Sequence, residues 1–303
     1  MERRVASLEH EQLVAALSAV GTVLTPKTAP STEGLRQIRE SEAAAGVVAP
    51  AGTEVMSCRY GDVDCLRLDA GQHRRTALYF HGGGYIYTRA ADALGAIAAL
   101  AKRCELQVIA PEYHRAPEST FPAAVDDAVA VYRALLAEGV SNTDIVMAGD
   151  SAGGGLALAC LIAAQRTGLP VPAAGIVFSP WTDLTVEGAS ADTADDPVVN
   201  GAGLRMMADV YLDGADPRHP LASPLYATDD ELASLPSLLI QVGTRESLLD
   251  DSRRFVARAT EAGTRVTYIE HPDVVHMWMV MAPELPESFQ AFDAAAHFLS
   301  GLI

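Results

Sequence analysis

A serine that could act as a nucleophile stands in the middle of residues 149–153, which read Gly-Asp-Ser-Ala-Gly. In this G-x-S-x-G pattern the serine lies on a sharp turn between a strand and a helix, so that its hydroxyl is exposed. Glycines two residues before and after Ser151 let the strand and the helix approach closely. The N–H of Ala152 would lie at a helix N-terminus, where the helix dipole favours negative charge. These residues predict covalent catalysis through Ser151.

A run of glycines follows a predicted strand at residues 81–84, which read His-Gly-Gly-Gly. Consecutive glycines are costly to order, so a chain keeps them where the backbone must approach something closely. We expect the N–H groups of Gly83 and Gly84, with that of Ala152, to hold the negative oxygen of a tetrahedral intermediate. His81 precedes the serine on this loop, and we expect it to bond its own loop and not to act as a base.

The base must be one of the histidines that follow Ser151, because this turn belongs to a fold whose order is nucleophile, acid, histidine. Those residues are His219, His271, His276 and His297. His219 comes before any strand end that could carry the acid, and His297 lies inside the predicted last helix. His271 and His276 both follow the last predicted strand, with His276 at the tip of the next loop.

Apolar runs predict the elements that must position these side chains. We expect strands at residues 55–60, 63–68, 76–80, 106–110, 145–148, 175–179, 237–242 and 265–270, and helices at 91–103, 123–138, 156–166 and 289–299. The first two strands form a hairpin around the Gly-Asp pair at residues 61–62. Strands that alternate with helices imply a mostly parallel sheet, with the site at the carboxyl ends of the strands.

Two segments fall outside this alternation. Residues 1 to about 45 have helical spacing, with breaks at Gly21 and Pro26, and residues of the acidic stretch from about 186 to 216 become helical at 203–212. We expect both to form a helical cap over the site, although the first could also be a loosely attached extension. The predicted organisation is a cap segment at 1–50 and a catalytic domain at 51–303 with a cap insertion at about 186–216.

Composition limits the classes of partner. The chain has 303 residues, 49% of them hydrophobic and 20% charged, which suits one large α/β domain. A net charge of −17 argues against nucleic acid and against an anionic membrane. No run approaches the ~18 apolar residues of a membrane span, and no apolar signal-peptide core follows the basic residues near Met1. The four cysteines lack metal-binding spacing. We therefore expect a cytoplasmic protein with reduced cysteines and no metal.

Three motifs in combination resemble the hormone-sensitive-lipase family of α/β hydrolases, in its bacterial carboxylesterase branch. They are His-Gly-Gly-Gly at 81–84, Tyr-His-Arg-Ala-Pro-Glu at 113–118 and Gly-Asp-Ser-Ala-Gly-Gly at 149–154. The likeness runs from about Val55 to the C-terminus, and His114 stands where the family usually has leucine. The resemblance implies an α/β-hydrolase fold: a mostly parallel eight-stranded sheet flanked by helices, with a helical cap and a Ser–acid–His triad. It also implies hydrolysis of short- to medium-chain carboxylic esters without a cofactor.

The resemblance also assigns the other two members of the triad. The family's histidine matches His276. Its acid lies in the pattern Gly-x-x-Asp-Pro-Leu-x-Asp, whereas residues 243–250 here read Gly-Thr-Arg-Glu-Ser-Leu-Leu-Asp. In this register the aspartate falls on Glu246, which can also accept the histidine Nδ1–H bond and fix the tautomer. The competing assignment gives the role to Asp250 or Asp251.

The sequence constrains the substrate pocket and the substrate less than it constrains the catalytic residues. Tyr85, Met206, Met207 and Tyr211 are candidates to line an acyl or alcohol pocket, although a place in the core fits them equally well. We expect a small-molecule ester as substrate, and a homodimer is compatible with the sequence. A lactone hydrolase, an aminopeptidase-like amidase and a non-catalytic ligand-binding homologue stay as alternatives, and the presence of both Ser151 and His276 favours catalysis.

Overall fold

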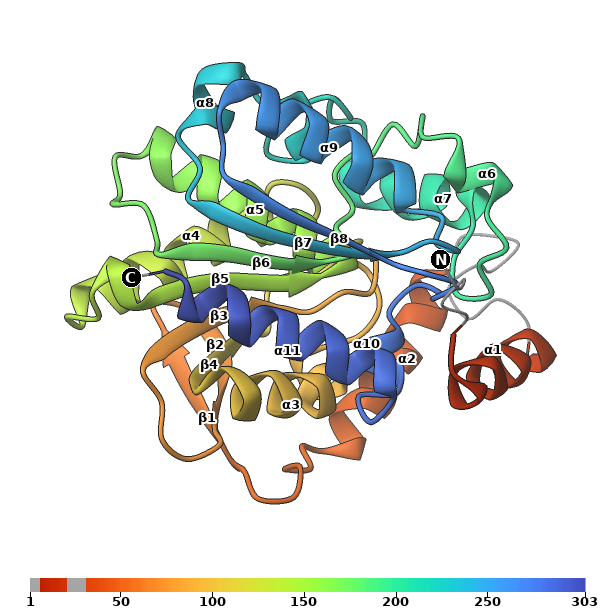
Figure 1. Cartoon of the computed structure of the whole chain (residues 1–303), viewed down its shortest axis with the longest axis horizontal. Coiled ribbons are helices and arrows are strands. Elements are labelled where there is room, and N and C mark those ends of the chain that lie inside the picture. The colour runs from red at the N-terminus through yellow and green to blue at the C-terminus, as the bar shows by residue number, and fades with distance from the viewer. Residues whose placement is uncertain (1–5, 21–30, 303) are drawn as a thin grey trace.

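The computed structural model, which describes residues 6–20 and 31–302, contains one twisted sheet with helices on both faces (Figure 1). The strand order is β1-β2-β4-β3-β5-β6-β7-β8. The strands are β1 (Glu54–Tyr60), β2 (Val63–Asp69), β3 (Arg75–Phe80), β4 (Leu106–Pro111), β5 (Ile145–Asp150), β6 (Ala174–Phe178), β7 (Ser237–Gly243) and β8 (Val266–His271). The eight-stranded α/β-hydrolase fold is therefore confirmed.

The sheet is parallel from β4 to β8 and antiparallel only at the edge formed by β1 and β2. The β1–β2 hairpin turns at residues 61–62, as the sequence predicts, with Tyr60 paired to Val63. The central strands have no polar face. In β5, Met147 faces one core and Val146 the other, because helices cover both sides of the sheet. This is why the strands occur in the sequence as continuous apolar runs.

Two layers of helices enclose the sheet. On one face lie α3 (Leu94–Cys104), α10 (Trp278–Met281) and α11 (Pro286–Ser300). On the other lie α4 (Ala123–Ala137), α5 (Ser151–Arg166), α8 (Asp229–Ala233) and α9 (Leu249–Ala262). Figure 1 shows α3 and α11 below the sheet and α5, α8 and α9 above it. Short 3-10 turns at Ala90–Ala93, Asn142–Asp144 and Pro224–Tyr226 complete the domain.

Helix α5 begins at Ser151, five residues earlier than the apolar spacing predicts. The glycine-rich turn is thus the first turn of the helix. Its glycines are required by packing, because a Cβ on Gly153 would lie 2.1 Å from the carbonyl oxygen of Phe80 in β3. Glycine lets α5 start directly against the sheet, which brings Ser151 to the carboxyl end of β5.

The N-terminal segment forms two helices, α1 (Leu8–Val20) and α2 (Thr32–Ala45). The predicted breaks at Gly21 and Pro26 lie outside the described residues. Helix α1 is attached to the domain through Ser7, whose N–H and hydroxyl both donate to Glu287 at the start of α11. Helix α2 buries Leu35 in the core. It is also held by Arg39, which donates to the carbonyl oxygens of Ile86 (2.9 Å) and Ala116 (2.7 Å).

The second segment outside the alternation lies between β6 and β7, as the sequence predicts. It contains α6 (Ser190–Thr193) and α7 (Gly201–Leu212). Asn200 caps α7 by accepting a hydrogen bond from Gly203 N–H. No helix in residues 6–20 and 31–302 has the length and apolar character to cross a membrane.

The attachment of α2 predicts a contrast between two arginines of that helix. Arg39→Ala removes bonds to two backbone carbonyls and to Glu118, so we expect the free energy of unfolding to fall by about 1–2 kcal/mol. Arg36 bonds Glu33 and Glu40 on the exposed face of its own helix, and Arg36→Ala should leave stability unchanged. Urea denaturation followed by circular dichroism measures both. Equal stability of the two variants would show that α2 is not held through Arg39.

Candidate active site

The predicted nucleophile, Ser151, lies at the junction of β5 and α5 with a φ of 53°. This left-handed conformation is unfavourable for a residue other than glycine by about 1–3 kcal/mol and persists only where the surroundings hold it. Here α5 and β3 hold it through the glycine contacts described above. Its side chain is nearly buried, and its hydroxyl faces the loop after β8.

His276 lies on that loop and bonds the serine. Its Nε2 is 2.8 Å from Ser151 Oγ, and its Nδ1 is 2.8 Å from Glu246 Oε2. Both histidine and glutamate are almost completely buried. A carboxylate on Nδ1 fixes the tautomer that carries the proton there, which leaves Nε2 free to accept the serine proton. The arrangement can therefore increase the nucleophilicity of Ser151.

Glu246 follows β7 directly, at the carboxyl end of the sheet. Its second oxygen, Oε1, accepts hydrogen bonds from Gly243 N–H (2.6 Å) and from the hydroxyl of Ser179 (2.7 Å). Both carboxylate oxygens are thus bonded although the side chain has no solvent contact. A buried carboxylate without such partners would be strongly destabilising.

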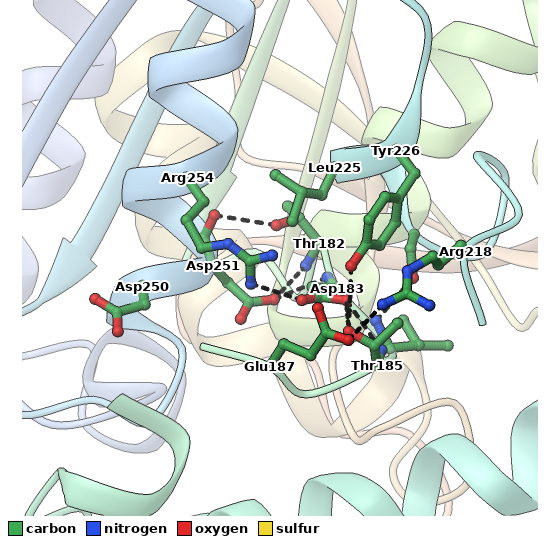
Figure 2. Close-up of polar contacts among 12 residues, drawn as sticks. Thr182, Asp183, Thr185, Glu187, Arg218, Leu225, Tyr226, Asp250, Asp251 and Arg254 are labelled. Carbon is green, nitrogen blue, oxygen red and sulfur yellow. Dashed lines mark hydrogen bonds and ion pairs between the residues drawn. The ribbon is translucent and has the colours of Figure 1, made fainter. Parts of the chain in front are cut away.

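The two competing acids lie in α9 and bond other groups. Asp251 Oδ2 accepts hydrogen bonds from Thr182 N–H and Asp183 N–H, both at 2.9 Å. Figure 2 shows Asp251 directed at these residues and Asp250 pointing away from them. Asp250 accepts from Ser190 N–H at 2.9 Å. Burial, with the adjacent charge of Asp183, raises the pKa of Asp251 to about 8, so this carboxyl is poorly suited to stabilise an imidazolium.

The environment of His276 sets its protonation. Burial alone would lower its pKa, because a charged imidazole loses its hydration. The hydrogen bond and the negative charge of Glu246, together with the charges of Asp196 and Asp150, outweigh that effect and raise the pKa above its ordinary value of 6.5. The site therefore favours the imidazolium that forms when Ser151 loses its proton.

The glycine loop has the geometry of an anion site. Gly83 and Gly84 have φ values of 88° and 63°, and a Cβ on Gly83 would lie 2.2 Å from Thr88 Oγ1. Within the described residues, neither glycine N–H donates a hydrogen bond to another group of the chain. Ala152 N–H lies in the first turn of α5, where backbone donors lack helical partners. That these three donors hold an oxyanion stays a prediction.

His81 holds this loop. Its Nδ1 is 3.0 Å from the carbonyl oxygen of Gly82, and its ring stacks on Tyr113 at a centroid distance of 4.2 Å. Tyr113 in turn donates its hydroxyl proton to the carbonyl oxygen of His81. Burial lowers the pKa of His81 to about 3, so it stays neutral. These contacts agree with the structural role that we expect for His81. They give His81 no role in proton transfer.

The remaining histidines bond elsewhere. His271 Nε2 lies 2.9 Å from Gln241 Oε1, and His219 Nδ1 accepts from Leu221 N–H. His297 lies in α11, as predicted. In the described parts of the chain, no group of three or more His, Cys, Asp or Glu side chains could hold a metal ion.

The predicted pocket residues pack mainly in the core. Tyr85 and Tyr211 stack at a centroid distance of 3.9 Å, and both are buried. Met207, from α7, lies against Gly84, since a Cβ on that glycine would be 2.1 Å from its sulfur. Met206, also from α7, is half-buried and packs against the same core cluster. Met207 and Tyr85 therefore lie next to the glycine loop, and a role of the four residues in substrate binding stays a prediction.

Three polar residues that touch the site were not singled out as members of it. Ser179 bonds Glu246, as described above. Asp196, from the insertion, accepts a hydrogen bond from Ser247 N–H at 3.0 Å. His10, from α1, accepts one from Val275 N–H at 3.3 Å. Only Ser179 had a signal in the sequence, because it ends the strand that precedes the acid-bearing strand. His10 and Asp196 come from the two segments predicted to form the cap.

Comparisons with known proteins agree with this geometry. A family model described as alpha/beta hydrolase fold matches residues 77–280. An acetyl-hydrolase of Streptomyces hygroscopicus is 44% identical over 263 residues, 86% of each chain. An esterase of Acinetobacter venetianus is 34% identical over 227 residues, 74% of each chain.

Solved structures are similar over nearly the whole chain. A crystal structure of EstE5 soaked with ethyl alcohol has a TM-score of 0.90 at 35% identity, covering 98% of this chain and 99% of that one. An esterase from the bacterial hormone-sensitive lipase family has a TM-score of 0.86 at 37% identity, covering 97% of both chains.

The charge on Glu246 predicts how Ser151 should react with an organophosphate. In the wild type, the rate of phosphorylation should fall as the pH drops through the raised pKa of His276, because the imidazolium cannot accept the serine proton. Glu246→Gln should lower the high-pH rate by roughly 10²–10⁴-fold and move the acid limb to lower pH, since the imidazolium loses its counter-charge.

Asp250→Asn is the matched control, because Asp250 is a carboxylate four residues away that bonds Ser190 and not His276. Its rate of phosphorylation should stay within about tenfold of the wild type. Loss of reactivity in Asp250→Asn with retention in Glu246→Gln would reassign the acid. Stopped-flow or mass-spectrometric labelling measures these rates.

Proposed function

The chain belongs to the alpha/beta hydrolase fold family, and we propose that it is a serine carboxylesterase that cleaves short- to medium-chain carboxylic esters through an acyl-enzyme on Ser151. The observation that carries this proposal is the buried hydrogen-bonded series Ser151–His276–Glu246 beside the free N–H groups of the glycine loop. Relatives named acetyl-hydrolase and esterase support the choice of a carboxylic ester as the substrate class.

In the first half-reaction, His276 Nε2 accepts the proton of Ser151 while Oγ attacks the ester carbonyl carbon. The N–H groups of Gly83, Gly84 and Ala152 bind the oxyanion of the tetrahedral intermediate. His276 then gives its proton to the leaving alkoxide, the C–O bond breaks, and an alcohol departs. The positive charge on the imidazole is stabilised throughout by Glu246.

In the second half-reaction, water replaces the alcohol. His276 Nε2 takes a proton from water, and the hydroxide attacks the acyl carbon. The same backbone donors hold the second oxyanion. Collapse of this intermediate returns the proton to Ser151 Oγ and releases the carboxylic acid.

We further propose that residues 1–50 and the insertion at about 186–216 form the cap of the site. Support comes from contacts with site loops. His10 of α1 bonds the backbone next to His276, and Met207 of α7 packs on Gly84. The acyl pocket in this proposal lies between the glycine loop and α7, with Tyr85, Met206, Met207 and Tyr211 at its wall.

A cytoplasmic location is the other part of the proposal. Cys58, Cys65, Cys104 and Cys160 are free thiols, and a reducing compartment keeps thiols in that form.

The substrate is a small-molecule ester. A homodimer stays a prediction, which light scattering of the purified protein tests directly.

Ser151→Ala tests the nucleophile. The variant should fold normally, because alanine fits the turn, and it should lose turnover of p-nitrophenyl butyrate by at least about 10⁴-fold. An organophosphate should label the wild type on Ser151 alone, as read by peptide mass spectrometry. Labelling of another serine, or an active Ser151→Ala protein, would overturn the assignment.

A panel of lactones and aminoacyl amides alongside the esters would identify a lactonase or amidase.

Deletion of residues 1–45 tests the cap. Removal of Leu35 and of the contact through His10 should expose apolar surface, so aggregation should rise. Activity on longer p-nitrophenyl esters should fall more than activity on the acetate. Arg36→Ala, which alters the same segment only at an exposed side chain, serves as the control. A truncated enzyme that stays monodisperse with an unchanged chain-length profile would show that the segment is a dispensable extension.

A further inference from the structure

Glu246 accepts a hydrogen bond from a serine that directly follows the neighbouring strand, β6. Of the described residues, two donate to Glu246 Oε1: the backbone N–H of Gly243 and the hydroxyl of Ser179, at 2.6 and 2.7 Å. The other carboxylate oxygen, Oε2, faces His276 Nδ1. Ser179 is therefore the side chain that bonds Oε1 of the carboxylate, while Oε2 faces the base.

A glutamate needs such a bond more than an aspartate does. Its additional methylene adds one rotatable bond, so the carboxylate of Glu246 has more orientations in which Oε2 would lose His276. Gly243 N–H and the Ser179 hydroxyl reach Oε1 from the ends of two neighbouring strands, and two donors restrict the movement of that oxygen more than one donor would. The bond is also to a charged acceptor, which makes it stronger than one between neutral groups.

The backbone of Ser179 carries a second sign of this role. The residue follows β6 with a φ of 48°, in the left-handed region where glycine is the relaxed choice. Its N–H donates to the carbonyl oxygen of Gln241 in β7 at 2.7 Å. Two residues later, Trp181 N–H donates to the carbonyl oxygen of Ser151 at 2.9 Å. A serine in this strained and buried position indicates that the hydroxyl is needed there.

We propose that Ser179 is a positioning residue, whose hydroxyl holds Glu246 Oε1 so that Oε2 stays directed at His276. This inference rests on the proposed esterase function. Ser179 touches neither substrate nor nucleophile side chain in this proposal, and it acts through Glu246 alone. In the absence of the hydroxyl, Glu246 bonds His276 less well and stabilises the imidazolium less.

The experiment compares Ser179→Ala and Ser179→Gly on p-nitrophenyl butyrate. Both remove the hydroxyl, but only glycine relaxes the left-handed backbone. Each should lower kcat by about 10- to 30-fold with KM within about twofold. The acid limb of kcat/KM should move to lower pH by roughly half a unit, because a less stabilised imidazolium has a lower pKa. A merely structural role would lower activity without moving the limb.

Two further variants test whether the effect of Ser179 acts through Glu246. In the background of Glu246→Asp, whose shorter side chain cannot bond Ser179 and His276 in the same way, Ser179→Ala should reduce kcat by less than about threefold. The matched control is Thr264→Val. It removes another buried hydroxyl, which donates to the carbonyl oxygen of Leu232 at 2.6 Å near the start of β8, and it should leave kcat and the acid limb unchanged.

The results separate this inference from the proposed function. An unmoved acid limb, an equal effect of Ser179→Ala in both backgrounds, or a Ser179→Gly enzyme as active as the wild type would overturn the role of Ser179. In each of those cases an active wild type and an inactive Ser151→Ala protein would leave the esterase proposal intact. A wild type that hydrolyses no ester would instead overturn the proposed function itself.

Discussion

The site depends on one constraint: a carboxylate, an imidazole and a hydroxyl must stay in a continuous hydrogen-bonded series that is almost completely buried. Glu246 and His276 are almost fully buried, and their Oε2–Nδ1 distance is 2.8 Å. In such surroundings an unpaired carboxylate is strongly unfavourable, so removal of either partner would disturb the fold as well as the chemistry. Burial by itself lowers the pKa of His276, and the hydrogen bond and charge of Glu246 are the largest effects that raise it.

Two central strands are followed, at the carboxyl edge of the sheet, by residues with a strained backbone. Ser151 follows β5, Ser179 follows β6, and both have positive φ values. Each turns the chain away from its strand at once, which keeps the residue at the carboxyl edge of the sheet. Met277, next to His276, also has a positive φ, but it lies on the loop after β8, at the start of α10. Strain at Ser151 and Ser179 is tolerated because parallel strand pairing on both sides of β5 and β6 holds the backbone.

Segments far away in the sequence complete the site. The N-terminal helix α1 reaches the backbone beside His276 through His10, and the insertion reaches the backbone beside Glu246 through Asp196. Both contacts are to main-chain N–H groups that would otherwise be buried without partners. Movement of either segment would therefore change the loops that carry the base and the acid, which links the proposed cap to the reactivity of Ser151.

Local sequence was sufficient for the strands and for the turn that carries Ser151. The strands were predicted to within one or two residues of their ends, because each is a short apolar run bounded by polar or turn residues. Ser151 and the glycine loop were recognisable because their geometry is set by neighbours in the chain. The start of α5 was placed five residues late, since glycines weaken the helical signal and only their contact with β3 requires them.

The choice among the candidate acids depends on tertiary contacts. Glu246, Asp250 and Asp251 lie within a stretch of six residues, and the local sequence pattern alone does not exclude any of them as the acid. Family resemblance favoured Glu246, and the contacts with Ser179 and His276 give the physical reason. Those contacts join β6, β7 and the loop after β8, which are separated by up to about a hundred residues in the chain. No local pattern carries that information, because a hydrogen bond between distant residues exists only once the sheet has brought their strands side by side.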